Sequence, residues 1–224
     1  MTVEQAINLS DFYQLMAIAW QYPTKELVEG ILAGTFGEDV ADCLVGLGVD
    51  PEEADALSNR LQEAARAEAE SAEALSKAMR VEYTGLFLVP MKEKVFLYES
   101  RFCYPKDANP KDYMVFVSPC ALHAEQAYKE AGVRVRASLQ EPADHIVTEL
   151  EFMAHVYRKA AESLHSEAKD ADLWLWRAKT FREFHLDKWY EDFLAQVFEE
   201  AESETYRMLA ILGGMKFDVS GSNR

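Results

Sequence analysis

The chain has 224 residues, of which 49% are hydrophobic and 28% are charged, and both fractions are typical of a globular protein. A fold of this length buries on the order of 70% of the surface of its unfolded chain, so its stability requires neither disulfides nor a metal. The formal net charge of −16 argues against nucleic acids and anionic membranes as partners, because both are bound through Lys and Arg. A cationic partner fits this charge, as does an acidic surface that only keeps the protein soluble.

The cysteines and the N-terminus indicate a cellular compartment. Cys43, Cys103 and Cys120 have neither the even count nor the CxxC spacing of a disulfide framework, and we expect buried, inert thiols in a reducing environment. The first residues, Met-Thr-Val-Glu-Gln, lack the basic start and apolar stretch of a secretory signal. No apolar run reaches the roughly 18 residues of a spanning helix. We therefore expect a soluble, cytoplasmic protein.

Two helices are predicted before residue 35. Ser10 is a good N-cap for the first, which carries apolar residues at helical spacing and stops at Tyr22-Pro23. Thr24 caps the second, and Gly34 stands where the end of a helix favours the left-handed conformation. Glycine and proline are scarce overall, with 10 and 7 residues, so helices are expected along most of the chain.

The next segment, residues 50–89, also has a helical pattern. Asp50-Pro51-Glu52-Glu53 combines a capping side chain, a proline at the first helical position and early carboxylates. The apolar spacing continues to Val89, with one break expected near Ser71. Residues 86–118 then combine prolines and many aromatic side chains with little periodicity. This composition predicts an ordered, aromatic-rich connection.

Helix signals return in the second half. Ser118-Pro119 starts a helix that ends at Gly132, and Pro142 opens another that continues to about Leu164. Asp170 can cap a further helix, and one long terminal helix is expected from about Asp187 to Gly213-Gly214. The sequence has no internal repeat and no convincing strand, so the predicted fold class is all-α, a helical bundle.

Motifs of catalysis are absent from the sequence. It contains no Gly-rich phosphate loop, no GxSxG and no HExxH, and we predict that the protein is not an enzyme. Glu151 and His155 stand four residues apart, but such pairs are common on solvated helix faces, so no metal is predicted. Trp174, Trp176 and Trp189 are assigned to packing or to an interface.

Two stretches are not explained by helix packing alone. Between Glu82 and Ser100 the apolar and aromatic side chains are too many for one helical stripe and indicate a groove or a partner surface. Glu141-Pro-Ala-Asp-His145 places an acid and an imidazole at the expected start of a helix. There they serve either as a simple cap or as a polar anchor between two helical halves.

Together these stretches resemble the TorD family of redox-enzyme maturation chaperones, which includes DmsD and, more distantly, NarJ-type proteins. The similar motifs are Tyr83-Thr-Gly-Leu86-Phe87-Leu-Val-Pro90, Tyr98-Glu99-Ser100, Glu141 to His145 followed by Glu149-Leu-Glu-Phe-Met153, and Phe184-His-Leu-x-x-Trp189. The segment between Pro90 and Tyr98 departs from the family, because it is more charged than the usual proline-rich version.

The resemblance implies a fold of two helical portions joined by a hinge. On this basis residues 1–132, with the connection 86–118, form the N-terminal portion, residues 133–144 the hinge and residues 145–224 the C-terminal portion of one compact domain. A monomer or a domain-swapped homodimer agrees with such a hinge.

The resemblance also implies a function. Members of the family bind the twin-arginine signal peptide, and sometimes the mature region, of a molybdenum oxidoreductase and hold it in the cytoplasm until its cofactor is inserted. The residues carried over to this client-binding surface are Leu86, Phe87, Tyr98, Glu99, Asp144 and His145. Which molybdoenzyme is the client stays open, and we expect no bound cofactor beyond weak guanine nucleotide binding.

The residues agree with such a client. A twin-arginine peptide has a basic start and an apolar middle, so it requires carboxylates beside an apolar surface. We expect Glu99 and Asp144 to meet the arginines, and Leu86, Phe87 and Tyr98 to receive the apolar part. Two alternatives are a nucleotide-binding switch, against which the missing phosphate loop argues, and a structural accessory subunit of the redox complex.

Overall fold

The computed structural model describes residues 1–89, 92–103, 118–133 and 142–217, and these residues form helices joined by short connections. The predicted all-α class is confirmed, since within these ranges the β-type pairing is limited to one isolated bridge between Tyr98 and His145. The helices are α1 Val3–Ala19, α2 Lys25–Ala33, α3 Thr35–Gly46, α4 Pro51–Glu68, α5 Ala72–Tyr83, a π-helical turn η1 Thr84–Leu88, α6 Glu99–Phe102, α7 Pro119–Glu130, α8 Ile146–His165, α9 Ala171–Phe184, α10 Leu186–Glu200 and α11 Glu204–Gly213.

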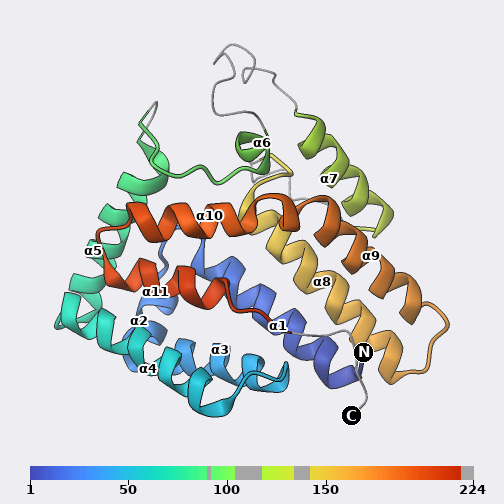
Figure 1. Ribbon diagram of the computed structural model, residues 1–224, viewed down its shortest axis with the longest axis horizontal. Helices are drawn as coiled ribbons and strands as arrows, with labels where there is room; N and C mark the ends of the chain where they lie inside the picture. The colour runs from blue at the N-terminus through green and yellow to red at the C-terminus, as the bar shows by residue number, and fades with distance from the viewer. Residues whose placement is uncertain (90–91, 104–117, 134–141, 218–224) are drawn as a thin grey trace.

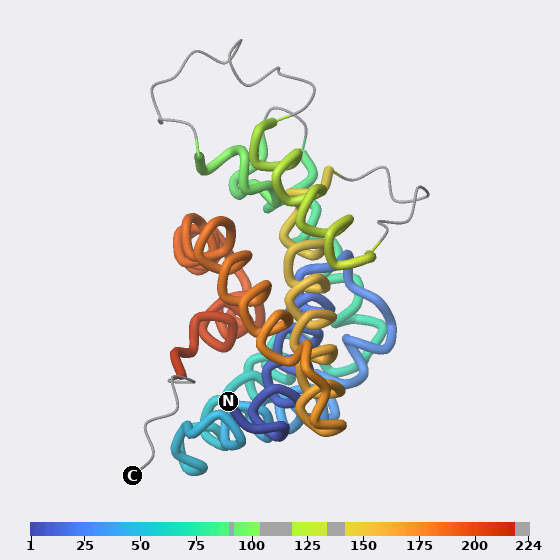
Figure 2. The backbone as a smooth tube through the Cα atoms, turned by 90° about the vertical axis from the view of Figure 1, so that its right-hand side faces the viewer, coloured from blue at the N-terminus to red at the C-terminus, as the bar shows by residue number. Residues whose placement is uncertain are grey.

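The centre of the fold is the pairing of α1 with α8 (Figure 1). Helix α9 covers α8, α3 packs on α1 and α4, and α11 lies between α4 and α10. Helices α2, α3 and α4 gather at the opposite end of the molecule from α7 (Figure 2). Buried side chains from both sides of the predicted hinge belong to one hydrophobic cluster. Residues 134–141 of that hinge lie outside the described ranges.

Several predicted helix boundaries are confirmed because local capping chemistry sets them. The Thr24 hydroxyl accepts a hydrogen bond from the Leu27 amide, and Gly34 ends α2 with a φ of 98°. Asp50 accepts from the Glu52 and Glu53 amides ahead of α4. Ser71 separates α4 from α5, as expected, by capping the latter.

Two predicted helix starts are wrong. The first helix begins at Val3 with a capping box on Thr2, whereas Ser10 lies inside it and donates a hydrogen bond across the helix pair to the Ala154 carbonyl, 3.0 Å away. The helix expected from Pro142 begins at Ile146, and His145 is its N-cap. The backbone just before Ile146 is already used in the bridge to residues 97–99.

The expected long terminal helix is two helices, and this prediction is therefore wrong. The helix is interrupted between α10 and α11, where the Glu82 carboxylate accepts hydrogen bonds from the Glu202 and Ser203 amides at 2.6 and 3.2 Å. The Glu68 carboxylate likewise accepts from the amide and hydroxyl of Thr205. Side chains of α4 and α5 thus satisfy the free amides at the start of α11.

Helix α3 was not predicted, and its glycines explain why. Gly37 faces α4 so closely that a Cβ there would lie 2.6 Å from the Ser58 hydroxyl, and a Cβ at Gly46 would meet the Asn8 side chain at 2.0 Å. Glycine disfavours an isolated helix, but here it allows close helix packing. Among the described residues, no helix is both long and apolar enough to cross a bilayer.

The burial of one face of α1 in the core predicts the effect of truncating Leu9, which is 1% exposed. Leu9→Ala should lower the free energy of unfolding by about 2–5 kcal/mol, since it removes buried methyl groups and leaves a cavity. The matched control is Ile7→Ala on the same helix, where the side chain is 46% exposed, and the expected loss is about 1 kcal/mol or less. Urea denaturation measures both, and equal losses would contradict the assigned packing.

Candidate functional site

Two predicted motifs that are far apart in the chain are joined by the bridge between Tyr98 and His145. The Glu99 amide donates to the Asp144 carbonyl at 3.0 Å, and the Ile146 amide donates to the Leu97 carbonyl at 2.8 Å. The Tyr98 ring meets the His145 ring edge to face, with centroids 5.2 Å apart. Four of the six predicted site residues therefore lie together.

Asp144 fixes the short helix α6. Its Oδ2 accepts a hydrogen bond from the Ser100 amide at 3.0 Å, as an acid at a helix N-terminus commonly does. The Asp144 side chain is 1% exposed, and His145 is 8% exposed. Asp144, predicted as part of a polar anchor between two helical halves, thus points inward, and its carboxylate accepts a hydrogen bond from a backbone amide.

Glu99 is buried inside this arrangement and pairs with one histidine. It is 2% exposed, and its Oε2 lies 2.7 Å from Nδ1 of His185, which is buried at the junction of α9 and α10. The other ring nitrogen of His185 lies 2.8 Å from Nδ1 of His123 on α7. Side chains of α6, α7 and the α9–α10 junction thus form one polar chain.

A second buried carboxylate, Glu149 on α8, lies beside Glu99 and His185, with ligand atoms of the three residues within 4.8 Å of one another. Its Oε2 accepts a hydrogen bond from the Trp189 indole at 3.1 Å, whereas Oε1 has no hydrogen-bond partner. Burial, and next the charge of Glu99, raise the pKa of Glu149 well above its ordinary value. The protonated form is therefore favoured, because two adjacent buried carboxylates repel each other when both are charged.

Sequence reasoning assigned no role to His185, His123 or Glu149. The burial of Glu149 could have been predicted from its spacing. It follows Ile146 by three residues and so lies beside the apolar stripe of α8. His185 stood in a family motif without an assigned partner. Its partner Glu99 is 86 residues away, a pairing that helical periodicity cannot reveal.

Two cysteines lie at the edge of this polar cluster. The Sγ atoms of Cys103 and Cys120 are 3.4 Å apart, and Cys103 Sγ is 3.9 Å from Glu99 Oε1. The expectation of buried thiols is wrong for this pair, since Cys103 is exposed and Cys120 is half-buried. It is right for Cys43. Partial burial raises the pKa of the Cys120 thiol to about 12 and also raises that of Cys103.

The other two predicted residues, Leu86 and Phe87, lie in η1 and face the core. They are 1% and 5% exposed, and the Phe87 ring stacks on Phe193 of α10 at 6.3 Å. The Leu86 carbonyl accepts hydrogen bonds from the Lys94 and Val95 amides. Phe193 contacts Trp189, the partner of Glu149, so η1 connects to the carboxylate cluster through aromatic packing.

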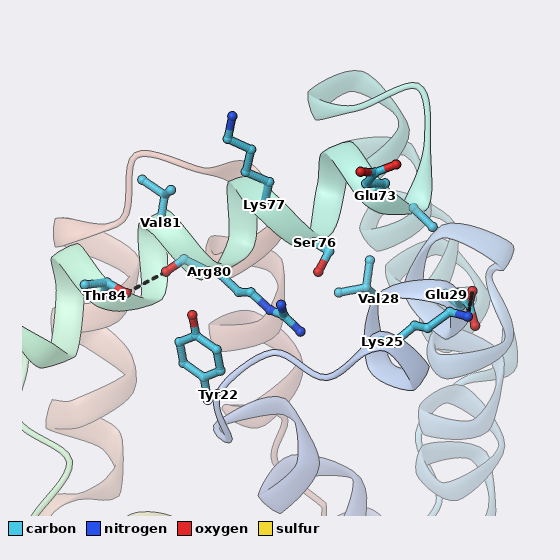
Figure 3. A pocket seen from close by; sticks show the side chains of 11 residues that line it. Tyr22, Lys25, Val28, Glu29, Glu73, Ser76, Lys77, Arg80, Val81 and Thr84 are labelled. Atoms are coloured by element: carbon cyan, nitrogen blue, oxygen red, sulfur yellow. Dashed lines mark hydrogen bonds and ion pairs between the residues drawn. The ribbon is translucent and has the colours of Figure 1, made fainter.

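An open pocket of about 810 Å3 lies elsewhere, between α2 and α5 (Figure 3). Arg80 forms part of its wall, with its guanidinium 5.5 Å from the centre of the Tyr22 ring and its Nε donating to the Pro23 carbonyl. Lys25 pairs with Glu29 at the rim, and Lys77 projects from α5. None of the six predicted site residues lines this pocket.

Comparisons with known proteins agree with the motifs. The family model for the nitrate reductase delta subunit matches residues 49–195. The chain is 26% identical over 134 residues, 60% of its length, to the chaperone protein TorD of Shewanella pealeana. It spans about half of that curated relative, 55% of the relative's length.

A solved structure supports the fold. A crystal structure of an Archaeoglobus fulgidus protein assigned to redox enzyme maturation is similar with a TM-score of 0.50, at 21% identity, over 91% of this chain and 90% of that one. The resemblance to TorD-like redox-enzyme maturation proteins is thereby confirmed. The relative is named a chaperone, in agreement with the prediction that the chain is not an enzyme.

The raised pKa of Glu149 predicts a pH dependence of stability. A carboxyl whose pKa is higher in the folded state contributes stability that is complete below its unfolded pKa of about 4.3 and is lost as the pH rises through the folded value. Glu149→Gln keeps an oxygen for the Trp189 indole and cannot ionise. This variant should lose less stability than the wild type between about pH 5 and pH 8.

Urea denaturation across this pH range measures the effect. Glu151→Gln, on the exposed face of the same helix, is the matched control and should follow the wild type. A wild-type pH profile in Glu149→Gln would show that Glu149 does not hold a proton.

Proposed function

Because the chain belongs to the nitrate reductase delta subunit family, we propose that it is a cytoplasmic chaperone for a molybdenum oxidoreductase. In this proposal it binds the twin-arginine signal peptide of the catalytic subunit, the apo form of that subunit, or both. It retains the client until the cofactor is inserted and so prevents premature export. The protein itself catalyses no reaction.

One observation carries the proposal. The bridge brings Tyr98-Glu99 and Asp144-His145, two motifs distant in the chain, to one place, so the carboxylates of Glu99 and Asp144 lie near the Tyr98 ring. Charged groups in a region of low dielectric act at longer range than solvated ones. The cluster therefore favours a basic segment at the half-buried Tyr98.

The burial of the cluster defines how a peptide is received. Glu99 and Asp144 are 2% and 1% exposed, so they do not touch the arginines directly. Their attraction acts across Tyr98 and α6, which separate them from the peptide. Direct contact would require α6 to separate from residue 144, which is bound to it by two hydrogen bonds. The pocket between α2 and α5 is a poorer receptor for arginines, since three basic and only two acidic side chains line it.

Calorimetric titration tests the proposal. The full chain is titrated with synthetic twin-arginine signal peptides of molybdoenzyme catalytic subunits, each paired with a peptide in which both arginines are replaced by alanine, at low and high salt. We expect micromolar or tighter binding that weakens with salt and with loss of the arginines. If a folded protein bound none of the peptides, the proposed role of the signal peptide would be wrong.

Asp144→Asn tests the site itself. The amide oxygen can still accept the hydrogen bond from Ser100, while the negative charge is lost, so the affinity for the peptide should fall about three- to tenfold at low salt. The matched control is Asp172→Asn on the exposed first turn of α9, which should leave the affinity unchanged. Thermal denaturation checks that both variants fold, and equal affinities of the two would remove Asp144 from the site.

A further inference from the structure

We propose that Cys103, Cys120 and Glu99 form a binding site for one zinc ion. Their ligand atoms, two sulfurs and a carboxylate oxygen, lie within 4.8 Å of one another. The inference is independent of the proposed function, since it rests on these three side chains and the groups that hold them.

The distances suit a tetrahedral zinc ion. With Zn–S bonds of about 2.3 Å, two sulfurs on one ion stand about 3.8 Å apart, and a sulfur and a carboxylate oxygen about 3.6 Å apart. The observed separations are 3.4 Å between the sulfurs and 3.9 Å between Cys103 Sγ and Glu99 Oε1. The third separation, between Cys120 Sγ and the Glu99 oxygen, is no more than 4.8 Å, so side-chain shifts of up to about 1 Å bring all three atoms to the bonding distance.

Two helices position the ligands. Cys103 ends α6, and its amide donates to the Glu99 carbonyl four residues earlier, which places both side chains on one face of the turn. Cys120 stands in the first turn of α7, after the Ser118 cap. The ion would thus bind between the end of one helix and the start of the next.

A second layer of contacts holds Glu99 in place. Its other oxygen, Oε2, lies 2.7 Å from His185, and His185 in turn lies 2.8 Å from His123. Residues that orient a metal ligand through such hydrogen bonds commonly contribute to affinity. The Glu99 carboxylate can therefore use one oxygen for the ion and the other for its histidine.

The ligand set and its exposure favour zinc at an accessible position. Thiolates select Zn2+ over the hard ions Mg2+ and Ca2+, which prefer oxygen ligands. Cys103 is exposed and Cys120 half-buried, so an ion can enter from solvent and keep water as its fourth ligand. The neighbouring group Glu99, Glu149 and His185 is also compact, but all three side chains are buried, so an ion has no comparable access from solvent.

Metal titration tests the proposal. The full chain, reduced with a phosphine and freed of metal by a chelator, is titrated with ZnCl2 against a chromophoric zinc indicator, and with CoCl2 as a spectroscopic probe. We expect one zinc ion per chain, and a cobalt spectrum with thiolate charge-transfer bands and the absorption of tetrahedral cobalt. Absence of stoichiometric binding, or a cobalt spectrum without sulfur ligation, would overturn the proposal.

Cysteine variants assign the ligands. Loss of a residue that only orients a metal ligand weakens metal binding about 10- to 100-fold. Cys103→Ser and Cys120→Ser each remove a ligand itself, so each should weaken zinc binding by more than that. Cys43→Ala, which removes the distant buried thiol, is the matched control and should bind zinc as the wild type does. Wild-type affinity in either serine variant would overturn the assignment.

A measurement on the wild type guards against misfolded variants. Alkylation followed by peptide mass spectrometry reads the accessibility of each thiol with and without ZnCl2. Zinc should slow the modification of both Cys103 and Cys120 at least tenfold. Equal alkylation rates with and without zinc would contradict the site.

Discussion

The arrangement of side chains around α6 depends on one requirement. Both oxygens of the buried Glu99 carboxylate need a polar partner. A buried charge without partners is strongly destabilising, so such a group draws donors from several elements. His185 reaches one oxygen from the α9–α10 junction, and the Cys103 thiol approaches the other. The position of α6 is set from its backbone as well, through Asp144. This one group thus couples α6 to the α9–α10 junction, 86 residues further along the chain.

The need of buried carboxylates for polar partners also explains why the site combines acids with aromatic side chains. Glu149 enters the cluster from α8 and is kept neutral by burial and by the charge of its neighbour. The Trp189 indole satisfies its second oxygen, and the same indole packs on Phe193, which contacts Phe87. Polar and apolar parts of the predicted site are therefore one packed unit. Phe87 is thus linked to the Glu149 carboxylate through the two rings of Phe193 and Trp189.

Contacts between residues that are close in the sequence could be predicted from it, whereas contacts between distant residues could not. The ends of α2 and the starts of α4, α5 and α7 follow from capping residues within a few positions of the boundary. The start of α8 and the break before α11 depend on partners dozens of residues away. For the same reason the motifs indicated Glu99 and Asp144, whereas their burial and the contact of Glu99 with His185 required the fold. The proximity of Cys103 and Cys120 depends likewise on how α6 meets α7.

The caps on α11 have a consequence for how the chain folds during synthesis. The carboxylates of Glu82 and Glu68 accept hydrogen bonds from amides 120 and 137 residues further along the chain. The Ser10 hydroxyl donates to a carbonyl 144 residues away. Contacts of such long sequence separation slow folding, because the entropy of loop closure must be overcome first. Until α8 has been synthesised, the first helix lacks the helix on which it mainly packs. The native core therefore forms only once both α8 and α11 have been synthesised.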